Sequence, residues 1–173
     1  MNTVLLSQGF RLLLIGVLQV VIFDRLRLGP LGPYYPDIVV YPLVLLWLPF
    51  RTPRPLQYLL AFGLGLGLDI TQLTPGLHAG AALTMMGFRP LVLRFLEPRA
   101  GYEALHSPTL RRFTIAWYAP YLLVLMLLYF LVYYSLEVFT PLYLGAILGK
   151  TMLSWSISAL FLFLVTMIYN PLD

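Results

Sequence analysis

Cysteine is absent from the 173-residue chain, and charged residues make up only 10% of it. The lack of cysteine excludes disulfides, thiolate metal sites and cysteine nucleophiles. Water-soluble domains carry roughly 25% charged residues, so this chain has too little polar surface to cover a water-soluble globule. The hydrophobic residues, 60% of the sequence, cluster into long runs, which indicates an integral membrane protein.

Catalytic motifs are missing as well. The sequence has no Gly-x-Ser-x-Gly, no His-Glu-x-x-His and no phosphate-binding loop of the Walker type. Its two histidines, His78 and His106, are expected on opposite sides of the membrane and offer too few ligands for a metal. The arginines lie between apolar runs and form no basic stripe, so no nucleic-acid partner is expected. We therefore predict a protein that is not an enzyme and has no metal or cofactor.

The apolar runs predict an all-α fold, a polytopic membrane bundle of about six transmembrane helices in a single domain. Twenty helical residues rise about 30 Å, which matches the hydrocarbon core of a bilayer. The predicted spans cover residues 4–23, 36–50, 53–71, 75–96, 108–136 and 141–168. The segment 36–50 is short and contains Pro42 and Pro49, so a short tilted helix, a broken helix and a re-entrant segment all fit it.

The last four predicted helices share a start signal, a hydroxyl residue followed by proline. The four pairs are Thr52-Pro53, Thr74-Pro75, Ser107-Pro108 and Thr140-Pro141. A hydroxyl group can cap the free N–H groups of the first turn, and proline is favoured at the first helical position. We expect each hydroxyl to cap the helix that follows it.

Arginine is unevenly distributed between the two sides of the predicted bundle. One side holds Arg51, Arg54, Arg94, Arg99, Arg111 and Arg112. The opposite side has only Arg25 and Arg27. Positively charged loops stay in the cytoplasm, so the arginine-rich side is predicted to be cytoplasmic. With six spans both termini are then cytoplasmic, and with a re-entrant second segment they lie on opposite sides.

Small residues recur four apart in the third, fourth and sixth predicted spans. They are Gly63 and Gly67, Gly76 and Gly80, and Gly145 and Gly149. Small residues let helix backbones approach closely in lipid, where packing drives association. These glycines either pack the bundle internally or form a docking groove for the helix of another protein.

Ionisable residues are expected at four positions in or near the membrane: Asp69, His78, Arg89 and Lys150. Such groups are costly in lipid and tend to be partnered. Asp69 and Lys150 are predicted at similar depths, so they form an ion pair, or else Asp69 caps the end of its own helix. His78 is expected to bond to Asp69 or to backbone. Arg89 precedes Pro90 and is expected to snorkel to cytoplasmic phosphates or to bond carbonyls freed by the proline kink.

Aromatic residues are abundant, with 12 Tyr, 11 Phe and 3 Trp. Tyrosine and tryptophan are typical of the belts at membrane–water interfaces. Tyr129, Tyr133 and Tyr134 lie deeper in the fifth predicted span, and we expect their hydroxyls to anchor at the outer interface or to face a partner.

A family resemblance covers the stretch from Pro49 to Tyr102. Its motifs are Leu48-Pro49-Phe50, the glycine-rich run Ala61–Leu68 followed by Asp69, Gly76-Leu77-His78-Ala79, and Arg89-Pro90. In these motifs the chain resembles the rod shape-determining protein MreD family, whose length, six spans and short tails also agree. The resemblance implies a fold similar to the substrate-binding S-components of ECF vitamin transporters. It also implies a structural role for the matching glycines.

The function that the resemblance implies is membership of the bacterial cell-elongation complex in the inner membrane. MreD-like proteins associate with MreC, with MreB filaments, and with RodA and the penicillin-binding protein that build the lateral wall. No enzymatic activity is attached to the family. The expected role is therefore to bind the single transmembrane helix of MreC and to support the peptidoglycan synthase in rod-shape maintenance.

The alternative function is a substrate-binding subunit, similar to an S-component, of a vitamin or small-molecule transporter. Such a subunit needs a polar pocket with several convergent groups on the outer side. The sequence offers Asp69, Thr71, Gln72, Thr74 and His78 near that position.

Overall fold

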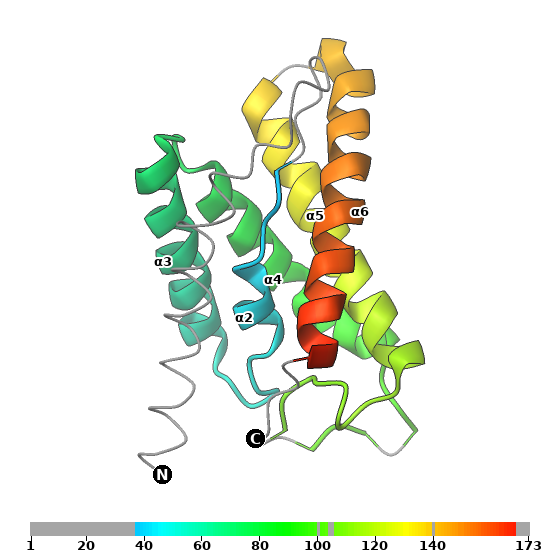
Figure 1. Cartoon of the computed structure of the whole chain (residues 1–173). Coiled ribbons are helices and arrows are strands. Elements are labelled where there is room, and N and C mark those ends of the chain that lie inside the picture. The colour runs from blue at the N-terminus through cyan, green and yellow to red at the C-terminus, as the bar shows by residue number, and fades with distance from the viewer. Residues whose placement is uncertain (1–36, 100, 104–105, 140, 169–173) are drawn as a thin grey trace.

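The computed structural model describes residues 37–99, 101–103, 106–139 and 141–168. Its elements are α2 Pro42–Leu46, α3 Arg54–Gln72, α4 Leu77–Phe95, α5 Ile115–Val138, the 3-10 turn η2 Pro141–Tyr143 and α6 Leu144–Ile168. None of the described residues lies in a strand, so the prediction of an all-α fold is confirmed. Helix α3 packs against α4, α4 against α5 and α5 against α6 (Figure 1). The predicted first span, residues 4–23, lies outside the described residues.

Two of the described helices are long and apolar enough to cross a membrane. They are α5 with 24 residues and α6 with 25 residues. Helices α3 and α4 have 19 residues each. That length gives a rise of about 28 Å, but both helices are less apolar. Two helices thus support a membrane protein, and a six-span topology stays a proposal.

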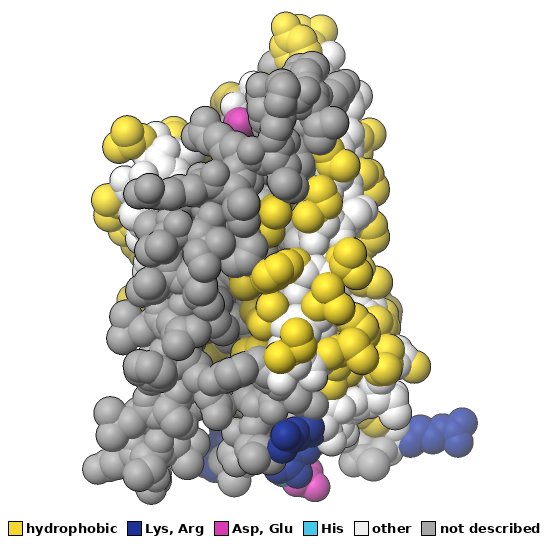
Figure 2. All heavy atoms as spheres, viewed as in Figure 1, with side chains coloured by type: hydrophobic (Ala, Val, Ile, Leu, Met, Phe, Trp, Pro, Cys, Tyr) yellow, Lys and Arg dark blue, Asp and Glu magenta, His cyan; other side chains and the backbone are white. Residues whose placement is uncertain are grey.

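Many large apolar side chains lie on the surface of the described helices, and several polar or charged side chains are buried. Large apolar side chains are exposed along the helices, among them Leu59 of α3, Phe95 of α4 and Leu160 of α6. Figure 2 shows such side chains along α6. The buried polar and charged side chains of the helices are Gln57, Asp69, His78, Arg89, Thr151, Ser154, Ser158 and Thr166. Most of the core is apolar as well, so the exposed apolar side chains are the feature that lipid favours.

Residues 37–50 pass through the middle of the bundle as a broken segment. The chain is non-helical from Asp37 to Val40 and forms the short helix α2, and it leaves the helix again before Pro49. Residues 39–47 are all buried, and Figure 1 shows the segment running between the α3–α4 pair and the α5–α6 pair. Of the three alternatives for 36–50, the structure has the broken helix. Pro42 starts the helix, and Pro49 does not continue it.

The predicted capping by hydroxyl residues is not observed at the described helix starts. The N-cap positions of α3, α4 and α5 are Pro53, Gly76 and Thr114, and none of them makes a side-chain capping bond. Helix α5 begins at Ile115 rather than at Pro108. The chain turns first, because the carbonyl of Thr109 accepts hydrogen bonds from the N–H groups of residues 112 and 113 at 3.2 and 3.0 Å. The fourth pair, at 140–141, is not fully described.

Candidate functional site

At three positions the backbone geometry favours glycine, either because a neighbouring atom lies too close for a Cβ or because φ is positive. A Cβ atom on Gly65 would lie 2.5 Å from Cα of Ala79, so this glycine sets the contact between α3 and α4. A Cβ on Gly80 would lie 3.1 Å from a methyl carbon of Leu136. Gly76 has φ +79° before the start of α4, a left-handed conformation that favours glycine. The sequence analysis overlooked Gly65, although it lies in the same glycine-rich run as the predicted pair.

The other predicted glycines are open. A Cβ on Gly63, Gly67 or Gly145 would meet nothing within 4 Å, and Gly149 is exposed on α6. Gly63 and Gly67 therefore do not pack α3 against the described helices. They belong to an exposed apolar surface, the open α3 face, made of Leu59, Phe62, Gly63, Leu66, Gly67 and Ile70.

Asp69 is buried and caps the start of α4. Its Oδ1 accepts hydrogen bonds from the Thr74 hydroxyl at 2.6 Å and the His78 N–H at 3.0 Å. Its Oδ2 accepts a bond from the Ala79 N–H at 3.0 Å. A carboxylate at a helix N-terminus satisfies free N–H groups and complements the helix dipole. The sequence predicted that Thr74 caps α4, but the cap is provided by Asp69. Asp69 therefore caps α4 rather than the end of its own helix.

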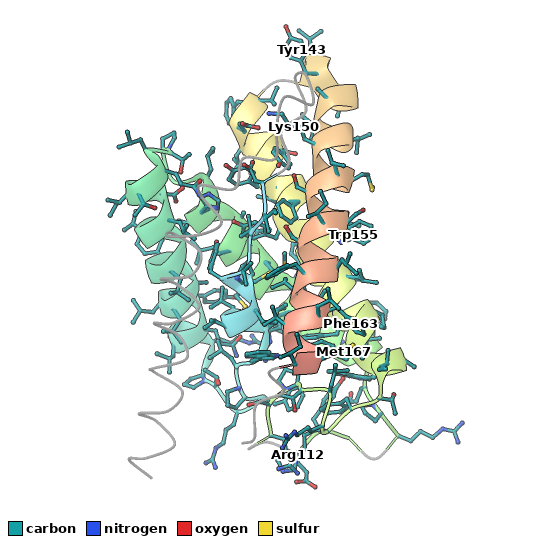
Figure 3. All side chains as sticks on the ribbon, viewed as in Figure 1. Arg112, Tyr143, Lys150, Trp155, Phe163 and Met167 are labelled. Atoms are coloured by element: carbon teal, nitrogen blue, oxygen red, sulfur yellow. The ribbon has the colours of Figure 1, made fainter. Side chains whose placement is uncertain are left out.

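Lys150 pairs with Glu137 instead of Asp69. The Lys150 Nζ lies 3.1 Å from Glu137 Oε2, at the end of the bundle where α5 passes into α6 (Figure 3). The predicted Asp69–Lys150 ion pair is therefore wrong. Helix rise gave similar depths for the two residues, but depth does not fix the direction in which each side chain points.

The ring of His78 belongs to a buried hydrogen-bond network. Its Nδ1 lies 2.5 Å from the Tyr129 hydroxyl, and its Nε2 lies 2.7 Å from Oε1 of Gln72. The Tyr41 hydroxyl lies 3.2 Å from both the Tyr129 hydroxyl and the His78 carbonyl. Both ring nitrogens thus have partners, and no three His, Asp or Glu side chains of the described residues gather where they could hold a metal ion.

Tyr129, Tyr133 and Tyr134 of α5 are buried in the bundle. Tyr129 is fully buried, and the Tyr133 ring lies 4.6 Å from the His78 ring. The Tyr134 hydroxyl donates to Asp37 Oδ2 at 3.1 Å and lies 2.5 Å from Oγ of Ser154. The expectation that these hydroxyls anchor at the interface or face a partner is wrong for Tyr129 and Tyr134, whose hydroxyls bond to groups inside the bundle.

Serines of α6 hold the non-helical start of the broken segment. The N–H of Asp37 donates to Ser154 Oγ at 3.0 Å, and the N–H of Val39 donates to Ser158 Oγ at 3.1 Å. The Ser158 hydroxyl donates back to the Asp37 carbonyl at 3.3 Å. Non-helical backbone at membrane depth is tolerated where protein groups satisfy it, and these serines do so.

Arg89 and Tyr121 hold the other end of the broken segment. The Arg89 Nε donates to the Tyr121 hydroxyl at 2.9 Å, and its Nη2 donates to the Leu48 carbonyl. The Tyr121 hydroxyl donates to the Leu46 carbonyl at 2.9 Å. Arg89 is only 1% exposed, so the prediction of snorkelling is wrong. Its carbonyl partner belongs to the segment after α2 and is not one freed by Pro90.

A cavity of about 320 Å³ adjoins Arg89 at the end of the bundle that carries the exposed arginines. Its lining consists of Phe50, Thr52, Pro53, Arg54, Gln57, Arg89, Pro90 and Leu93. Gln57 is buried and donates through Nε2 to the Thr52 carbonyl at 2.7 Å, while Arg54 is exposed. The cavity therefore combines a buried cation, an exposed cation and apolar walls.

Aromatic rings tie the two arginine-bearing loops together beside this cavity. The rings of Phe50 and Tyr102 stack at 4.5 Å, and the rings of Phe50 and Phe113 meet edge to face at 5.8 Å. The Tyr102 hydroxyl donates to the Leu93 carbonyl at 2.8 Å, and burial raises the pKa of Tyr102. These contacts fix one wall of the cavity.

Comparison with protein-family models, curated proteins and solved structures finds no significant match to this chain. The MreD resemblance thus depends on the sequence motifs alone. These motifs meet in two pairs in space. The glycine-rich run with Asp69 contacts Gly76–Ala79, through Gly65 and the Asp69 cap. Leu48–Phe50 meets Arg89-Pro90, through the Leu48 carbonyl and the shared cavity.

Proposed function

We propose that the protein is a non-enzymatic, MreD-like membrane subunit of the bacterial cell-elongation complex. It binds the single transmembrane helix of MreC and, together with MreB and RodA or its penicillin-binding protein, supports peptidoglycan synthesis during rod-shape maintenance. The carrying observation is the open α3 face, an exposed apolar helix surface with Gly63 and Gly67 beside exposed Leu59 and Ile70. In lipid, exposed small residues favour association because a second helix can approach the backbone closely.

The pairing of the motifs supports the same proposal. Motifs far apart in the sequence form the α3–α4 contact and the contact between Leu48 and Arg89. They therefore act as a structural unit, as the resemblance implies.

The proposed topology is multi-pass in the inner membrane, with six spans and a fold similar to S-components. Helices α3 and α4 have the length of a short span, and the apolar outer surface extends over α3, α4, α5 and α6. The exposed arginines of the two loops lie at one end of the bundle, where Figure 3 labels Arg112. By the positive-inside rule this end is cytoplasmic, and with six spans both termini are cytoplasmic too.

The transporter alternative finds less support. The polar groups that an outer pocket would use are bonded to one another, since Asp69 is bonded to Thr74 and His78 to Gln72. The carbonyls exposed by the broken segment are also occupied, as Leu46 and Leu48 accept bonds from Tyr121 and Arg89. A ligand site needs such groups to be free.

The test is partner capture through the open α3 face. Gly67→Leu and Gly63→Leu should abolish co-purification with MreC in mild detergent, because leucine blocks close approach while nothing within 4 Å in the bundle is disturbed. Gly145→Leu, an equally open glycine on α6, is the matched control and should keep the partner. Normal co-purification of both α3 variants contradicts the proposal.

A photocrosslinker at Leu66 identifies what covers this face. Leu66 is exposed between the two glycines. A crosslink to the MreC helix supports the proposed docking. A crosslink to residues 4–23 of the same chain shows that the protein covers the face itself and rules the docking out.

A further inference from the structure

Arg89 carries a buried positive charge that no described carboxylate pairs with. Its side chain is 1% exposed, and its hydrogen bonds go to two neutral oxygens, the Tyr121 hydroxyl and the Leu48 carbonyl. These bonds use Nε and Nη2, which leaves the N–H groups of Nη1 for a further acceptor. A buried charge is costly unless it is paired, so the site as it stands favours an anion.

The described acids are all engaged or directed elsewhere. Asp37 accepts a bond from Tyr134, Asp69 caps α4, and Glu137 pairs with Lys150. Glu103 pairs with His106 at 3.0 Å, and Glu97 is exposed in the loop after α4. Among the described residues, none of these carboxylates forms an ion pair with Arg89.

The cavity beside Arg89 adds two features that favour a negative charge. Arg54 lines it from the first position of α3, and the first turn of that helix has no side-chain cap. An uncapped helix N-terminus attracts anions through its free N–H groups and its dipole. The cavity thus joins a buried guanidinium, a second guanidinium and a helix start.

The rest of the lining indicates the size and character of the occupant. Phe50, Pro90 and Leu93 give the cavity apolar walls, and its volume is about 320 Å³. An arginine N–H group donates a charge-assisted hydrogen bond to a phosphate oxygen, and the N–H groups of Nη1 are available for such a bond. A bare anion leaves much of this space empty, whereas a phosphate with a small organic group uses the apolar walls too.

We propose that this cavity binds a phosphate-bearing ligand, with Arg89 and Arg54 on the phosphate oxygens and the apolar walls on the organic group. The ligand is the headgroup of an anionic phospholipid or a soluble phosphate compound, and both share this chemistry. The site lies at the arginine-bearing end, away from the open α3 face, so it does not depend on the partner proposed above.

The test measures ligand binding to the full chain in a mild uncharged detergent. Native mass spectrometry with phosphatidylglycerol tests the lipid source, and calorimetry with inorganic phosphate and glycerol phosphate tests the soluble source. Diacylglycerol, which lacks the phosphate, is the apolar control. The variants are Arg54→Gln and Arg89→Gln, and Arg94→Gln is the matched control because Arg94 is exposed on α4 and does not line the cavity.

We expect saturable binding of at least one phosphate probe and none of diacylglycerol. The loss of one charged hydrogen-bond donor should weaken the affinity for the phosphate probe about tenfold in Arg54→Gln, and by more in Arg89→Gln. Arg54→Gln keeps the test valid if Arg89→Gln fails to fold, because Arg54 is exposed. Binding of the lipid alone identifies a headgroup site, and competition by glycerol phosphate identifies a soluble ligand. The absence of saturable binding, or an equal loss in Arg94→Gln, overturns the proposal.

Discussion

Glycines and serines make different contacts on the inward and the outward faces of the same helices. On α3, Gly65 faces α4 at contact distance, whereas Gly63 two residues earlier has open space around it. On α6, buried Ser158 bonds to the backbone of the broken segment, whereas exposed Ser156 bonds only to the Met152 carbonyl of its own helix. Residue type alone therefore does not indicate a role. The side of the helix decides whether a glycine or a serine holds the bundle together.

The sharpest contrast is expected between two alanine substitutions on α3. Gly65→Ala places a Cβ 2.5 Å from Cα and 2.7 Å from N of Ala79. Backbone atoms cannot rotate away as a side chain does, so the helices must separate, at a cost of about 3 kcal/mol. Unfolding in detergent with increasing dodecyl sulfate, followed by circular dichroism, measures the loss.

Gly63→Ala is the control and should change stability in the opposite direction. Its Cβ meets nothing within 4 Å, and alanine is the better helix former by up to about 1 kcal/mol. Equal effects of the two substitutions would break the distinction between the faces of α3.

The serines of α6 should show the second largest contrast. Ser158→Ala leaves the buried N–H of Val39 without its acceptor and removes the donor to the Asp37 carbonyl, at a cost of about 2 kcal/mol. Ser156→Ala removes only an exposed bond to its own helix and should be nearly neutral. Hydrogen exchange of the Val39 amide provides a local readout, and unchanged protection in Ser158→Ala would contradict the assigned role.

Much of the helical architecture was predictable from the sequence. Apolar runs placed α3, α4 and α6 within a few residues of their observed bounds, since hydrophobic length is a local signal. The start of α5 was predicted wrongly, because Ser107-Pro108 precedes a separate turn closed by the Thr109 carbonyl, and α5 begins only after this turn at Ile115. The broken segment was one of three alternatives. Its backbone is tolerated because Ser154 and Ser158 bond its start while Tyr121 and Arg89 bond its end.

The candidate sites were less predictable, because they depend on which way side chains face. Helix rise gave Asp69 and Lys150 similar predicted depths, yet Asp69 bonds to the start of α4 and Lys150 pairs with Glu137. Three glycines at alternate positions in α3 offered no sequence signal that would separate Gly65 from its neighbours. Arg89 was expected to snorkel to phosphates or to bond carbonyls freed by Pro90, but it is buried and bonds the Leu48 carbonyl, because the broken segment offers an unpaired carbonyl beside α4.

Asp69→Asn should have a smaller effect than either inward substitution above. Asparagine keeps one side-chain oxygen for the N–H groups of His78 and Ala79 but loses the negative charge at the start of α4. The expected cost is about 1 kcal/mol, from the weaker cap and the lost interaction with the helix dipole. The same dodecyl sulfate titration measures it, with Asp69→Ala expected to cost more. A neutral result for both would show that α4 does not need this cap.

The smallest effect is expected at the rim, where Lys150 pairs with Glu137. Their side chains are 22% and 35% exposed, so solvent screens the 3.1 Å ion pair. Lys150→Gln should cost less than about 1 kcal/mol, and the cost should shrink as salt is added. Unfolding titrations of the parent chain and Lys150→Gln at low and high salt measure the difference. A larger, salt-independent loss would contradict this assignment. It would mean that Lys150 behaves as a buried residue rather than as a solvent-exposed one.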